Sequence, residues 1–286
     1  DVYGNSFTYG HQKGEYAWPS LLSEHLKCRV RNFGVGAYGS DQAHMKFLLR
    51  DNHSKIVFLN HLSENIIRNL NQFRNFIYPS GASFGFKPRY IIDDDNLKLI
   101  SIPKISNEKI YNFLEQPKKY LSNEYFIPNG ASGIQHLGFP YTIKIVKSFN
   151  HWHVKKKIRN IPARYIEFYS KDHASKGLKL TYEIMNDFYK QANSRGLTPI
   201  LTVFPTCRDL EYFTIYKKYP YENLINLFEQ TGIKYIDFGP IIINRNRNNF
   251  KKLYQECWGH WNEEGEALIA EVIYEYISNN DLLKKN

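Results

Sequence analysis

Two residues near opposite ends of the chain have the types that a nucleophilic reaction needs. Ser6 lies in the segment Gly4-Asn5-Ser6, directly after an apolar pair, which is typical of a strand end that presents a serine to solvent. His260 lies in Gly259-His260-Trp261-Asn262, just before a stretch with helical character. A serine hydroxyl reacts only when a neighbouring base takes its proton, and an imidazole can do so. Taken alone, Ser6 could be an ordinary turn serine, and His260 could be a residue beside a helix N-cap.

The segments that must position these residues predict a parallel sheet covered by helices. Helical spacing of apolar residues occupies 16–26, 41–49, 178–193, 221–230 and 263–277, and strand-like runs occupy 28–33, 55–59, 199–205 and 234–238. Alternating strands and helices favour an α/β fold, a three-layer α/β/α sandwich with a flavodoxin-like sheet of about five strands. Ligands of such sheets bind beyond the carboxyl ends of the strands, where Ser6, Gly36 and Asn65 all fall.

The alternation stops from about 71 to 172, where Pro, Gly and aromatic residues separate short segments. No Gly/Ser-rich or Pro-rich linker brackets this stretch, so we predict an insertion, or cap, within a single domain spanning 1–286. Its aromatic side chains suit either stacking on sugar rings or a core of their own.

Four separated blocks resemble those of the SGNH, or GDSL-like, hydrolase superfamily. The first is Gly4-Asn5-Ser6-Phe7-Thr8-Tyr9-Gly10, the second runs from Asn32 to Gln42, the third is Asn65, and the last is His260-Trp261-Asn262-x-x-Gly265. The resemblance implies that Ser6 attacks an ester carbonyl and that His260 relays the proton. It further implies an oxyanion hole made by the backbone N–H of Ser6, the N–H near Gly36 and Ala37, and the Asn65 side chain. No metal or organic cofactor is needed.

The chain departs from the family pattern at three places. Asn5 replaces an Asp, and Ala37 falls on or next to a family Gly, where a backbone donor is tolerated if φ stays negative. The family's acid before the histidine is replaced by Cys257 and Trp258. Glu256, Asp237 or Asp209 could orient His260 instead, or a backbone carbonyl could leave a Ser–His dyad. Loss of a triad acid that nothing replaces can cost on the order of 10⁴ in rate.

The predicted function is hydrolysis of a small acyl ester, an acetyl group on a carbohydrate being the expected substrate class. One alternative is an O-acetyltransferase that passes the acyl group to a glycan hydroxyl. Another is a catalytically impaired glycan-binding protein. The acyl group, the acceptor and the oligomeric state do not follow from the sequence.

The formal net charge of +10 would suit an anionic polymer or membrane surface, or a solvated surface with no partner. No zinc-finger spacing or RNA-binding signature accompanies the charge, so nucleic acid is not an expected partner. His151 and His153 resemble a metal pair but lack a third ligand, and packing or surface roles are the expectation.

Cys28, Cys207 and Cys257 are odd in number and scattered, so we expect reduced thiols, which favour a cytoplasmic protein. No apolar run approaches the roughly 20 residues of a membrane span. Only three residues precede Gly4, whereas a central strand needs about five. The chain is therefore expected to begin inside a longer product, which leaves secretion or membrane tethering open.

Overall fold

The computed structural model describes residues 1–10, 14–78, 85–130, 132–136, 138–149, 151–257 and 259–283. It divides the chain into two compact units, and we describe each by itself. The first unit joins residues 1–65 to residues 182–286, and the second spans residues 66–181. The stretch predicted as an insertion, 71–172, falls within the second unit.

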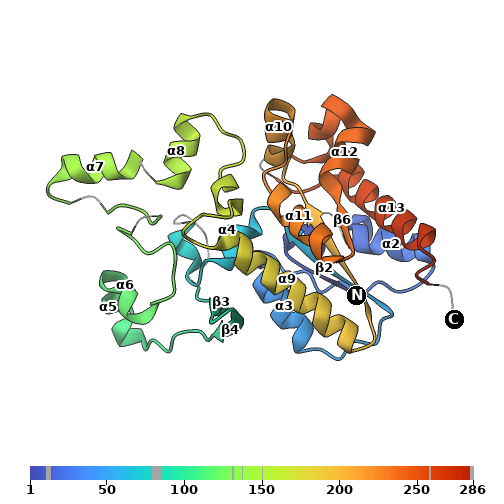
Figure 1. Ribbon diagram of the computed structural model, residues 1–286, viewed down its shortest axis with the longest axis horizontal. Helices are drawn as coiled ribbons and strands as arrows, with labels where there is room; N and C mark the ends of the chain where they lie inside the picture. Colours follow the sequence, from blue (N-terminus) through green and yellow to red (C-terminus); the bar gives the residue numbers. More distant parts are fainter. Residues whose placement is uncertain are drawn as a thin grey trace. The chain divides into compact units, whose positions relative to one another are not determined.

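A four-stranded parallel sheet forms the centre of the first unit (Figure 1). Its order is β1 (Val2–Tyr3), β2 (Ile56–Leu62), β5 (Thr198–Phe204) and β6 (Tyr235–Asp237). Every residue of β2 is buried, as the continuous apolar run predicts for a central parallel strand. The α/β class and the parallel sheet are therefore confirmed.

The predicted strand at 28–33 is wrong as a full strand. The segment forms a single parallel bridge from Asn32 to Val2 at the edge of the sheet. Only one neighbour is available there, and Arg29 and Arg31 alternate with the apolar residues, so little apolar surface favours a longer pairing. When the 28–33 segment is counted as the edge strand beside β1, the strands follow one another in the order of a flavodoxin-like sheet.

Helices cover both faces of the sheet. On one face α2 (Trp18–Leu26), α12 (Phe238–Asn246) and α13 (Glu263–Asn279) share a core with the even-numbered side chains of β2 and β5. On the other face Tyr3 packs edge-on against Phe47 of α3 (Ser40–Leu48), and Phe47 packs against Phe188 of α9 (Gly177–Ser194). This is a three-layer α/β/α sandwich.

The first unit contains several further helical elements. They are α1 (Ser6–Tyr9), the 3₁₀ turn η1 (Gly14–Tyr16), α10 (Cys207–Tyr216), α11 (Glu222–Thr231) and the 3₁₀ segment η5 (Arg247–Leu253). The helix α4 (Asn65–Asn69) begins in the first unit and continues into the second.

The second unit has a core of its own. Phe73, Phe113, Phe126, Trp152 and Phe168 are all buried, and neighbouring rings pack at centroid distances such as 5.1 Å for Phe73 and Phe113. These aromatic side chains, which could have stacked on sugars, therefore pack on one another.

Short helices and one hairpin surround this core. They are η2 (Arg74–Phe76), β3 (Arg89–Asp93), β4 (Asn96–Ile100), η3 (Asn107–Lys109), α5 (Ile110–Glu115), α6 (Pro117–Tyr120), α7 (Tyr141–Phe149), α8 (Trp152–Ile158) and η4 (Ile166–Tyr169). β3 and β4 pair antiparallel across the acidic turn, where Asp94 and Asp95 have positive φ. None of the described helices is both long and apolar enough to cross a membrane.

Candidate active site

Ser6 is the first residue of α1, in a turn fixed by its neighbours. The Oδ1 atom of Asn5 accepts a hydrogen bond of 2.9 Å from the Phe7 N–H and caps the helix. Gly4 has no room for a side chain, because a Cβ there would lie 2.0 Å from Thr8 Oγ1. The tight turn leaves Ser6 half-buried at the carboxyl end of β1.

His260 lies within hydrogen-bond distance of Ser6. Its Nε2 atom is 2.7 Å from Ser6 Oγ, although the two residues come from opposite ends of the chain. The Phe7 ring packs against the imidazole at a centroid distance of 4.9 Å. The structure thus brings the predicted nucleophile and the predicted base together at a distance that allows proton transfer.

A short closed loop carries the imidazole. At its base Tyr254 and Trp261 form an antiparallel bridge, and the Gln255 N–H donates to the His260 carbonyl at 3.0 Å. Trp261 is fully buried, which fixes one end of the loop in the core. Glycine is required at position 265 beside this loop, because a Cβ there would lie 2.3 Å from the Leu253 carbonyl oxygen.

A disulfide ties this loop to the start of α10. Cys257 is joined to Cys207, with a Cα–Cα distance of 5.1 Å. The prediction of reduced thiols is therefore wrong for these two residues, and with it the argument for the cytoplasm that depended on them. The two cysteines are 50 residues apart in sequence, and only the fold brings them within bonding range. Cys28 is exposed and free.

The candidate acids lie in different surroundings. The Glu256 side chain is exposed and makes no hydrogen bond or ion pair to any residue that the structure describes. Asp237 accepts from the Tyr221 hydroxyl at 3.0 Å and from the Gly239 N–H at 2.9 Å, and burial raises its pKa to about 6. Buried Asp209 accepts from Ser63 Oγ and from the Thr206 N–H. Trp258 lies outside the described residues.

Asn65 is fully buried and is held by polar side chains on both sides. Its Oδ1 atom accepts from Asn5 Nδ2 at 3.1 Å, and its Nδ2 atom lies 3.5 Å from Ser40 Oγ. Ser40 Oγ is in turn 2.7 Å from Nδ1 of His61. Burial lowers the pKa of His61 to about 3, so the ring is neutral and can accept the hydroxyl hydrogen.

This chain of contacts gives the Asn65 amide a direction. Because Asn5 donates to the oxygen end, the N–H₂ end points the other way, toward Ser40. Sequence reasoning finds Asn65 but misses Ser40 and His61, since no spacing marks them and a buried serine or histidine is unremarkable by type.

The loop of the second block approaches α1 closely. A Cβ on Gly34 would lie 2.3 Å from the Tyr9 backbone nitrogen, so glycine is required at this contact. Gly36 is exposed, and a Cβ there would meet nothing within 4 Å. Ala37 has φ of +70°, so the condition of a negative φ is not met: this alanine is in the left-handed region usually taken by glycine.

Metal ligation finds little support among the described residues. Nε2 of His153 is 2.6 Å from the guanidinium of Arg164, so this ring nitrogen already has a polar partner. Cys207, Glu211 and Cys257 cluster within reach of one ion. The two sulfurs are bonded to each other, however, and Glu211 pairs with Arg208 and Lys251.

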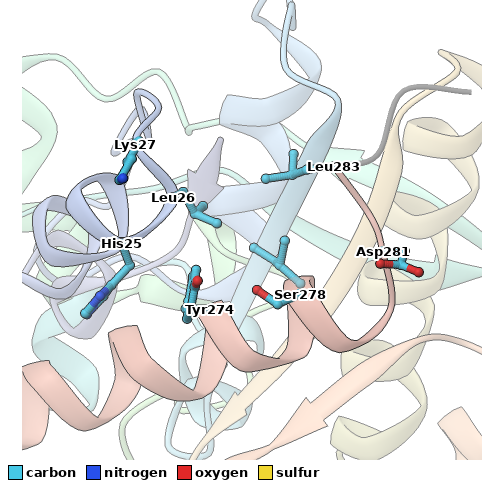
Figure 2. A pocket seen from close by; sticks show the side chains of 8 residues that line it. His25, Leu26, Lys27, Tyr274, Ser278, Asp281 and Leu283 are labelled. Atoms are coloured by element: carbon cyan, nitrogen blue, oxygen red, sulfur yellow. The ribbon is translucent and has the colours of Figure 1, made fainter.

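A surface pocket opens elsewhere on the first unit, between the end of α2 and the end of α13 (Figure 2). Its lining includes His25, Lys27, Tyr274 and Asp281. Neither Ser6 nor His260 lines it, so this pocket is separate from the Ser6–His260 pair.

No protein-family model matches the chain, and no curated protein sequence matches it. Among solved structures, the chain is similar to a candidate lipolytic protein of the G-D-S-L family from Desulfitobacterium hafniense DCB-2. That similarity has 12% identity and a TM-score of 0.46 and covers 96% of each chain. A second crystal structure matches with 11% identity and a TM-score of 0.45, over 97% of this chain and 94% of the other. In the four blocks around the candidate active site, the chain resembles the SGNH, or GDSL-like, hydrolases.

Proposed function

We propose that this protein is a serine esterase that hydrolyses a small acyl ester, with Ser6 as the nucleophile and His260 as the base. The observation that carries the proposal is the 2.7 Å contact between His260 Nε2 and Ser6 Oγ. Serine and histidine are common residues, but this pair lies at the carboxyl edge of a parallel sheet, where such folds bind ligands. The four family-like blocks, found in order, support the same assignment.

The reaction would proceed in two steps. Ser6 Oγ forms a bond to the ester carbonyl carbon while His260 takes the hydroxyl proton, and the carbonyl oxygen becomes an oxyanion. The carbon–oxygen bond to the alcohol then breaks, and His260 returns the proton to that alcohol. In the second step His260 takes a proton from water while the water oxygen attacks the acyl carbon. The bond from that carbon to Ser6 Oγ then breaks, His260 returns the proton to Ser6 Oγ, and the acid leaves.

The oxyanion would be stabilised by the Ser6 N–H, by the N–H near Gly36 and Ala37, and by Nδ2 of Asn65. Each such donor is typically worth about 3 kcal/mol. The Asn65 amide supports this role because Asn5 takes its oxygen end and leaves the donor end toward Ser40.

His260 would be oriented either by a carboxylate, in a non-standard triad, or by a backbone carbonyl, in a Ser–His dyad. Asp237 and Asp209 are hydrogen-bonded to other groups, and Glu256 is exposed. In either case the loop's bridge and its disulfide to α10 would limit how far the imidazole moves. An acetyl group on a carbohydrate is the proposed substrate class, and it rests on the family resemblance alone.

A covalent probe and product analysis test the proposal. A fluorophosphonate should label wild type at Ser6 and leave Ser6→Ala unlabelled, and hydrolysis of an aryl acetate should be lost in the same variant. Equal activity in both proteins would remove Ser6 as the nucleophile. With a sugar acetate as donor and a second sugar as acceptor, free acetate supports an esterase, whereas dominant transfer to the acceptor would instead identify an O-acetyltransferase.

A further inference from the structure

In the second unit, the helix α7 turns its apolar side to solvent. The helix is strongly amphipathic, yet none of its residues is buried. Tyr141, Ile145 and Phe149 follow one another at intervals of four and share one side, with exposed fractions of 60%, 49% and 54%. Ile143 and Val146 extend the same exposed surface. A helix of a water-soluble protein normally buries such a face.

The polar side of α7 is the one that contacts the rest of the unit. Lys144 and Ser148 are its least exposed residues. Lys144 Nζ donates to Asn129 Oδ1 at 3.2 Å. The neighbouring helix α8 is held differently, because its Trp152 is buried against Phe126 and Phe168. The α7 helix is therefore oriented with its apolar side outward, next to a well-anchored neighbour.

The sequence around α7 and α8 carries positive charge only. No Asp or Glu occurs between Glu124 and Glu167, whereas that stretch holds Lys144, Lys147, Lys155, Lys156, Lys157, Arg159 and Arg164. Lys156 pairs with Glu167 at 3.2 Å. Lys147, Lys157 and Arg159 are exposed and make no ion pair to any residue that the structure describes.

We propose that α7 and α8 form a membrane-surface element that binds anionic lipid, with the apolar side of α7 in the headgroup region. Helices that lie in this region combine an apolar face that enters the acyl boundary with Lys and Arg that contact anionic headgroups. At nine residues α7 is too short to span a bilayer and long enough to lie on one. The proposal is independent of the proposed esterase activity.

Charge and exposure together favour a membrane over other occupants. A second copy of the chain would set the same basic surface against itself in a two-fold dimer, which like charges disfavour. An anionic polymer would be attracted by the lysines but would give Ile145 and Phe149 nothing to enter. A bilayer with acidic lipids satisfies both features at once.

Vesicle flotation with the full chain tests the proposal. Wild type should float with vesicles of phosphatidylcholine and 30% phosphatidylglycerol, and bind vesicles of phosphatidylcholine alone roughly tenfold more weakly. The double variant Ile145→Ser, Phe149→Ser should lose binding by about tenfold or more, because two inserted apolar side chains are gone. Lys147→Glu with Lys157→Glu should lose the preference for anionic lipid.

Tyr111→Ser is the matched control, because Tyr111 is an exposed aromatic residue of α5 in the same unit. It should bind vesicles as wild type does, and circular dichroism should be the same for all variants. Unchanged flotation of the double serine variant would overturn the proposal. So would binding to a soluble anionic polymer that equals vesicle binding in strength and salt dependence, or a dimer in sedimentation that the double variant abolishes.

Discussion

Ser6 and His260 meet at 2.7 Å, but the two residues are held by different means. The serine is fixed by neighbours in sequence and by buried amides: Asn5 caps its helix and also bonds Asn65. The histidine lies on a loop closed by one bridge and tied to α10 by a disulfide. The serine end depends on polar contacts that are satisfied locally, whereas the histidine end depends on a covalent bond to a distant segment.

Because of this difference, the serine end and the histidine end should tolerate different substitutions. A buried amide network is specific in direction, so a change of one atom type can reverse it. A disulfide limits how far a loop moves, whatever the chemistry of the residues inside that loop. The following experiments act on one end at a time.

Replacement of the histidine should have the largest effect. His260→Gln should lower kcat for an aryl acetate by about 10⁴, because Ser6 loses the base to which it is hydrogen-bonded. His136→Gln is the control, since His136 is an exposed histidine of the second unit. Activity of His260→Gln within threefold of wild type would show that the contact is not catalytic.

On the serine side, Asn65→Ala should lower kcat by about 10² to 10³, because one oxyanion donor is removed. KM should change little, as the donor acts mainly on the transition state. Steady-state kinetics on the aryl acetate give both values, and a melting curve shows whether the fold survives.

Asn5→Asp tests the direction of the Asn65 amide at the serine end. A carboxylate at position 5 still caps α1 but cannot donate to Asn65 Oδ1, so the Asn65 amide should turn over and present oxygen toward Ser40. We expect a smaller loss than that of Asn65→Ala, because the family pattern has Asp at this position and the backbone donors of the oxyanion hole remain. Full activity in Asn5→Asp would mean that the direction of the amide does not matter.

At the histidine end, the double variant Cys207→Ser, Cys257→Ser removes the disulfide. The free energy of unfolding should fall by about 4 kcal/mol, because the disulfide closes a loop of 50 residues. The rate should fall roughly tenfold as the imidazole loses its fixed position. Cys28→Ser is the control, since this cysteine is free and exposed. A stability loss at unchanged kcat would assign the disulfide to the fold and not to His260.

Replacement of Asp237 should have a smaller effect, which concerns the stability of the fold and not the rate of the reaction. Burial raises the pKa of Asp237 to about 6, above its ordinary value of 3.8. The folded chain therefore keeps a proton that the unfolded chain releases, and wild type loses about 2 kcal/mol of stability as the pH rises from 4 through 6.

Asp237→Asn cannot ionise, so its melting temperature should exceed that of wild type by more at pH 7.5 than at pH 4.5. The kcat of this variant at pH 7.5 should equal that of wild type. A hundredfold loss of kcat would instead make Asp237 the acid that orients His260.

The contrast between the serine end and the histidine end also explains which parts of the site can be predicted from the sequence. The strands and helices around Ser6 and Asn65 are visible in apolar spacing, and the Gly4-Asn5-Ser6 turn is a local pattern, so both were predictable. The Ser40–His61 contact joins two chain segments of ordinary composition, and nothing local marks it. The disulfide was missed because three cysteines with no regular spacing do not reveal which two the fold brings together. Two helices are also missing from the prediction. α10 begins at Cys207, two residues after the run 199–205, and α12 begins at Phe238, the last residue of the run predicted as a strand at 234–238.

Ala37 has a practical consequence for protein engineering. A left-handed alanine costs roughly 1 kcal/mol relative to glycine, because its Cβ crowds the following carbonyl. Ala37→Gly should therefore raise the thermal midpoint slightly while keeping the same backbone N–H in place. Its neighbour Gly34 allows no such freedom, since any side chain there would enter the backbone of α1. Within one short loop, one position is open to stabilisation by design and another is closed to every residue except the one it has.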